Sequence, residues 1–131
     1  MTRRLASPGV VLMLLGAVHA VWGIAVYHDP LAEIARAGVF DTVGDGIFKT
    51  TGDRGARATA LWFMVFAPLV ALIGYLVEAA IRARDGRALK VAAWAVLGFG
   101  LALLVAVPRS PLWLALPISW WLFRTGKRVS R

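Results

Sequence analysis

Residues 58–81 read ATALWFMVFAPLVALIGYLVEAAI, an apolar stretch whose only charged residue is Glu78. A helix needs roughly 20 residues to cross the hydrocarbon layer of a bilayer, and this stretch is long enough. The runs at 9–27 and 89–107 meet the same criterion, and a shorter run at 112–123 can follow if its flanking arginines snorkel to the interface. The sequence therefore predicts an all-α integral membrane four-helix bundle.

The composition agrees with a single transmembrane domain over residues 1–131. The chain has 131 residues, of which 60% are hydrophobic, and it contains no cysteine. This excludes an ordinary soluble globule, a disulfide framework, a thiolate metal site and a cysteine nucleophile. The formal charge of +8 does not point to nucleic acid, because the basic residues lie between apolar blocks.

The distribution of basic residues predicts the orientation of the chain. With four spans, ten Lys and Arg residues fall on the side of the termini and five on the other side, where acidic residues dilute them. Basic residues accumulate in cytoplasmic loops. We therefore expect a multi-pass protein of the plasma (inner) membrane with cytoplasmic N- and C-termini.

The extracytoplasmic loop at 28–57 is the only polar segment that is longer than a connector. Asp29 can cap a helix with Pro30 at its first position, and Gly38 can end it. Its apolar stripe comprises Leu31, Ile34 and Ala35. The loop thus predicts a short amphipathic helix on the outer membrane surface, the alternative being a solvated connector.

An ionisable side chain within the bilayer needs a physical reason, and His19 is the best example in this chain. Gly16, His19 and Gly23 share one helical face, where the glycines allow a ligand or another helix to approach the imidazole. We expect an outward-facing aromatic pocket whose lining comprises His19, Trp22, Trp62, Phe63 and Phe66. The alternative is a histidine that only binds a hydroxyl or carbonyl of a neighbouring helix, such as a carbonyl freed by Pro68.

Glu78 is the second candidate. It shares a helical face with small residues at positions 67, 71 and 74, so it should point into the bundle. Arg82 stands four residues later, where an ion pair would satisfy the carboxylate without any chemistry. The other interpretation is a proton-coupling carboxylate.

No catalytic group, metal site or cofactor is predicted. The only other histidine, His28, is nine residues from His19, and a metal ion would need further ligands. No Ser-His-Asp order, phosphate loop or acid pair is present in a convincing arrangement.

The chain resembles the DUF6463 family, small bacterial four-helix membrane proteins of unknown function. The matching pieces are Gly16-Ala-Val-His19 followed by Gly23, Asp29-Pro30-Leu31, Ala60-Leu61-Trp62-Phe63 with Gly74, and Val107-Pro108 before the last helix. The resemblance extends over nearly the whole chain. It implies a four-helix architecture and no particular reaction.

Four functional hypotheses remain open. The first is a bundle that holds a lipid or other apolar small molecule near His19. The second is a dimeric proton-coupled exporter that uses Glu78, and the third, with least support, is an enzyme with His19 as its acid or base. The fourth is a structural or partner-binding subunit. The expected partners are membrane lipid, an apolar small molecule and a second copy of the chain, and no nucleic acid.

Overall fold

A computed structural model describes residues 7–37, 53–106 and 111–130, and every regular element in these ranges is helical. In chain order the elements are α1 (Pro8–Val26), α2 (His28–Ala37), α3 (Asp53–Arg82), α4 (Gly86–Ala106), the 3-10 helix η3 (Pro111–Leu114) and α5 (Ala115–Val129). The predicted all-α class is confirmed.

Within these described ranges, three helical segments are long and apolar enough to cross a membrane. They are Pro8–Val26, Gly55–Arg82 and Gly86–Val105. They correspond to the first three predicted spans, although α3 begins at Asp53 rather than at 58, and residue 107 lies outside the described residues. The fourth predicted span does not reach this length by itself, because residues 111–114 form η3 and α5 has only 15 residues.

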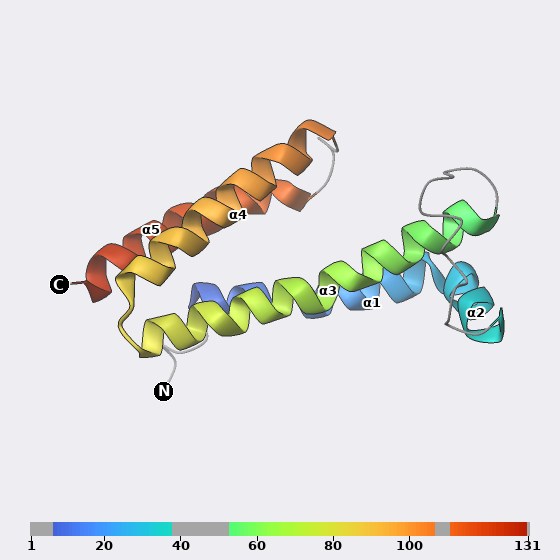
Figure 1. Cartoon of the computed structure of the whole chain (residues 1–131), viewed down its shortest axis with the longest axis horizontal. Helices are drawn as coiled ribbons and strands as arrows, with labels where there is room; N and C mark the ends of the chain where they lie inside the picture. The colour runs from blue at the N-terminus through green and yellow to red at the C-terminus, as the bar shows by residue number, and fades with distance from the viewer. Residues whose placement is uncertain (1–6, 38–52, 107–110, 131) are drawn as a thin grey trace. The chain divides into compact units, whose positions relative to one another are not determined.

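The chain divides into two compact units. The central unit comprises Leu12–Leu72, and the terminal unit comprises Met1–Val11 with Ile73–Arg131. In the central unit, α1 runs antiparallel to α3 and lies directly against it (Figure 1). A Cβ atom on Gly16 would lie 2.7 Å from the Ala67 carbonyl oxygen, so this crossing requires a residue without a side chain.

The terminal unit contains an antiparallel pair formed by α4 and α5 (Figure 1). Close contacts occur at both ends of this pair, where Gly86 meets Gly126 and Gly100 meets Ala115. Between these ends, Leu89 and Leu122 have no exposed surface. Helix α5, together with η3, therefore extends along most of α4.

Helix α2 confirms the predicted short helix in the first loop, but it begins earlier than the capping pattern indicates. Only Tyr27 separates it from α1, and the Leu31 backbone N–H donates to the Tyr27 carbonyl oxygen at 3.0 Å. Asp29 consequently lies in the first turn instead of at the cap. Ile34 is buried and Ala35 is exposed.

An ion pair joins α2 to the start of α3 in the central unit. The Glu33 carboxylate lies 3.7 Å from Arg57 Nε. The part of the predicted loop at 38–52, including Gly38, lies outside the described residues. The position of α2 on the outer membrane surface stays a prediction.

Candidate functional site

His19 lies against Phe63 in the central unit. The two rings stack with their centroids 3.9 Å apart and an interplanar angle of 15°, and His19 Nε2 is 3.0 Å from the Phe63 carbonyl oxygen. A carbonyl oxygen only accepts hydrogen bonds, so Nε2 is the protonated nitrogen in this contact. Pro68 has no N–H to donate to the Met64 carbonyl four residues earlier. The observed acceptor, the Phe63 carbonyl, is thus the neighbour of the carbonyl that Pro68 leaves free.

The other ring nitrogen of His19, Nδ1, accepts no hydrogen bond from any of the described residues. None of the described buried side-chain nitrogens lacks a partner, so Nδ1 is not fully buried. The side chain is half-buried. Nδ1 is therefore an accessible hydrogen-bond acceptor on an otherwise apolar helix.

The remaining predicted lining residues are placed differently. Trp22 and Trp62 are 64% and 53% exposed, so their rings extend outward from α1 and α3. Phe66 is half-buried. Of the five residues, the structure thus brings His19 and Phe63 into direct contact and leaves both tryptophans open to the surroundings of the central unit.

Gly23 and Tyr27 complete the environment of Phe63. A Cβ atom on Gly23 would lie 2.9 Å from the Phe63 ring, and the Tyr27 ring centroid is 5.1 Å from that of Phe63. Tyr27 is not among the lining residues predicted from the sequence. Its spacing of eight from His19 and four from Gly23 places it on the same helical face, which is the signal that identifies it.

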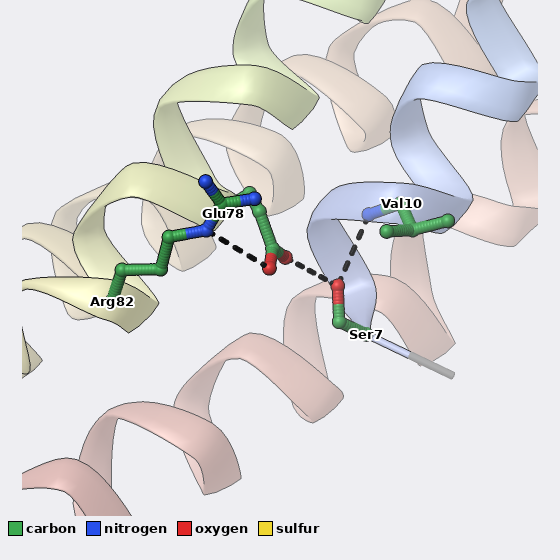
Figure 2. A network of polar contacts seen from close by, with 4 residues as sticks. All are labelled: Ser7, Val10, Glu78 and Arg82. Atoms are coloured by element: carbon green, nitrogen blue, oxygen red, sulfur yellow. Dashed lines mark hydrogen bonds and ion pairs between the residues drawn. The ribbon is translucent and has the colours of Figure 1, made fainter. Parts of the chain in front are cut away.

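Glu78 belongs to a separate polar cluster in the terminal unit. Figure 2 shows its carboxylate between α1 and α3, where Oε2 accepts a hydrogen bond from the Ser7 hydroxyl at 2.5 Å. Oε1 lies 3.7 Å from Arg82 Nε, so the pair expected from the four-residue spacing is present. Ser7 also accepts a hydrogen bond from the Val10 N–H, which makes it the cap of α1.

Ser7 is a partner of Glu78 that the sequence does not predict. Ser7 and Pro8 form a recognisable cap and first helical residue. That local pattern predicts the hydrogen bond to Val10, but it says nothing about a carboxylate 71 residues away. Only the packing of α1 on α3 brings the two side chains together.

A groove opens beside Glu78. It has a volume of about 380 Å³, and its lining comprises Tyr75, Glu78, Ala79, Arg82 and Ala83. The Glu78 side chain is 18% exposed and that of Arg82 is 76% exposed. The groove is therefore lined by a mostly buried acid and a largely exposed guanidinium. Within the described ranges, no group of three His, Cys, Asp or Glu residues could hold a metal ion.

Comparison with known families assigns the chain as a whole. The model of a family of unknown function, DUF6463, matches residues 3–129. The chain belongs to the DUF6463 family. No curated protein and no solved structure matches it. The DUF6463 assignment names no reaction, so a function for this chain has to be argued from the geometry around His19 and Glu78.

Proposed function

We propose that this DUF6463 protein is a multi-pass protein of the plasma membrane that holds a lipid or other apolar small molecule against His19. Support for the membrane comes from the three long apolar helices and from the side chains that they expose. Large hydrophobic residues that are at least 45% exposed include Val18, Val21, Trp22, Leu69, Leu72, Val91, Trp94, Phe99 and Val105. A surface of this kind suits hydrocarbon and would promote aggregation in water.

Four passes are part of the proposal. Three spans alone would place the two termini on opposite sides of the membrane. Helix α5 is too short to be counted by length, but its pairing with α4 carries it through the same depth if α4 crosses. Both termini then lie on the cytoplasmic side, as the excess of basic residues favours.

The observation that carries the ligand proposal is the uncommitted Nδ1 of His19. In hydrocarbon no water is present to satisfy this acceptor. An apolar molecule with a hydroxyl or amide N–H can donate to it, while the exposed Trp22 and Trp62 offer flat apolar surface nearby in the central unit. We therefore expect an apolar ligand with one hydrogen-bond donor.

Native mass spectrometry of protein released gently from membranes tests this proposal. The two nitrogens of His19 can be separated by substitution: His19→Gln keeps a donor near the Nε2 position, and His19→Asn keeps an acceptor near the Nδ1 position. We expect His19→Gln and His19→Leu to lower retention of the bound lipophile by about tenfold, whereas His19→Asn retains more of it.

The matched control is His28→Leu, which removes the exposed histidine and should leave retention unchanged. Circular dichroism shows whether each variant keeps its helices. Wild-type protein that carries no small molecule, or equal retention by wild type and a folded His19→Gln variant, would contradict the proposal and favour a structural or partner-binding role.

A further inference from the structure

The groove beside Glu78 lies at the end of the longest apolar helix. Its residues at positions 75, 78, 79 and 82 share one face of α3, because they are separated by three, four and seven residues. Arg82 is the last residue of both α3 and the candidate span Gly55–Arg82. This inference rests on the proposed membrane placement: if α3 crosses the membrane, the groove lies at the depth where an apolar helix meets lipid headgroups.

The Glu78 carboxylate and the Arg82 guanidinium lie close together, but both can still form further hydrogen bonds. The 3.7 Å separation between Arg82 Nε and Glu78 Oε1 exceeds the length of a direct hydrogen bond. Glu78 Oε1 therefore keeps acceptor capacity, and the guanidinium keeps most of its donors, because the Arg82 side chain is 76% exposed. Ser7 holds the other carboxylate oxygen and so fixes the position of the acid (Figure 2).

We propose that this groove binds the headgroup of a zwitterionic phospholipid with a primary ammonium, of the phosphoethanolamine type. The phosphate oxygens accept hydrogen bonds from the Arg82 guanidinium, and the ammonium donates to Glu78 Oε1. Ala79 and Ala83 leave room for the short linker between them. Tyr75, which is 61% exposed, offers a phenol of the kind that is favoured at the membrane interface.

The balance of charge favours this class over other headgroups. The groove contains one acid and one base and is therefore neutral, which matches a zwitterion better than an anionic lipid. A quaternary ammonium cannot donate a hydrogen bond to Glu78 and is bound best by several aromatic rings, whereas this groove has only the ring of Tyr75. The site is independent of the ligand proposed at His19.

Competitive lipid binding to the full-length protein tests the proposal. Native mass spectrometry in detergent compares lipids with the same acyl chains and phosphoethanolamine, phosphocholine or phosphoglycerol headgroups. We expect wild type to bind the phosphoethanolamine lipid about tenfold more tightly than the phosphocholine lipid. Glu78→Gln should remove this preference, because the amide can still accept from Ser7 but lacks the charge that attracts the ammonium.

Arg82→Gln should weaken the binding of both zwitterionic lipids by about tenfold, because both contain the phosphate. Arg87→Gln is the matched control, since it removes an exposed cation that does not line the groove. His19→Gln should keep the headgroup preference, which separates this site from the one at His19.

Two outcomes would overturn the assignment. The first is a wild-type protein that does not distinguish the two zwitterionic lipids, a result that requires no variant to fold. The second is binding of the phosphoglycerol lipid at least as tightly as the phosphoethanolamine lipid, with equal losses in Arg82→Gln and Arg87→Gln. That result would show only a diffuse attraction between basic residues and anionic lipid.

Discussion

Gly16 and Gly98 are both glycines of long apolar helices, but their surroundings differ. A Cβ atom on Gly16 would lie 2.7 Å from a backbone oxygen of α3, whereas no described atom lies within 4 Å of the corresponding position on Gly98. We expect Gly16→Ala to lower the free energy of unfolding by about 1–3 kcal/mol, because the two backbones must separate. Gly98→Ala, the matched control, should not destabilise the protein. Reversible unfolding in mixed micelles measures both, and equal effects would contradict the close approach of α1 and α3.

Ser7 has two roles in the terminal unit, as cap of α1 and as donor to Glu78. We expect Ser7→Ala to lower the free energy of unfolding by about 1 kcal/mol, the usual cost of a lost cap. Ser7→Thr keeps the hydroxyl and should restore most of this loss. The same unfolding measurement checks the pair, and a Thr variant as unstable as the Ala variant would show that the hydroxyl is not the stabilising group.

Helix α5 is shorter than a standard membrane span, but it packs along most of α4. Its 15 residues are too few for a standard span, yet it lies along α4 from Gly100 to Gly86. Two of its basic residues, Lys127 and Arg128, are in the last turn. This end of α5 lies beside the start of α4. The packing therefore predicts that α5 crosses the membrane with α4 as one hairpin.

Single cysteines test this topology directly, because the chain has none of its own. Variants with Ala83→Cys and Lys127→Cys should react with a membrane-impermeant maleimide from one side, and Ser110→Cys from the other. Ala35→Cys should react from the same side as Ser110→Cys. Labelling of positions 110 and 127 from the same side would show that α5 does not cross.

The structure brings together basic residues that the sequence places on the predicted cytoplasmic side. Contacts of Gly86 with Gly126 and Ser130 bring the start of α4 beside the end of α5. Exposed basic residues gather there, namely Arg84, Arg87, Lys90, Lys127 and Arg128. Asp85 is occupied as the cap of α4, where it accepts from the N–H groups of residues 87 and 88.

Removing these charges should disturb the orientation of the whole chain. We expect the combined substitution of Arg84, Arg87 and Lys90 by Gln to produce a mixture of two orientations. The reason is that an excess of Lys and Arg in a short loop keeps that loop on the cytoplasmic side. Maleimide labelling of Ala35→Cys from both sides of the membrane would report the mixture. Arg36→Gln is the control and should leave a single orientation, and unchanged labelling of the triple variant would rule out this cluster as the determinant.

Some contacts of the candidate sites can be predicted from local spacing in the sequence. The others join residues that are far apart in the sequence. Four residues separate Glu78 from Arg82, so their proximity is a property of any helix. The partner of His19 could only be predicted as some carbonyl or hydroxyl, since Phe63 is 44 residues away. The sequence predicts Trp22 and Trp62 beside His19, but hydropathy does not determine which aromatic ring faces the neighbouring helix and which faces outward.

The helices follow from the amino-acid sequence alone, because the length of an apolar run and the spacing of caps, glycines and charges act within a few residues. These local features predict the three long apolar helices, the short helix α2 and the Glu78–Arg82 pair. Other contacts arise only in the folded protein: Ser7 donates to Glu78, Phe63 stacks on His19, and α5 packs along α4. These contacts join residues that are far apart in the sequence. They depend on the shapes of two helix surfaces, which meet only when the helices pack together.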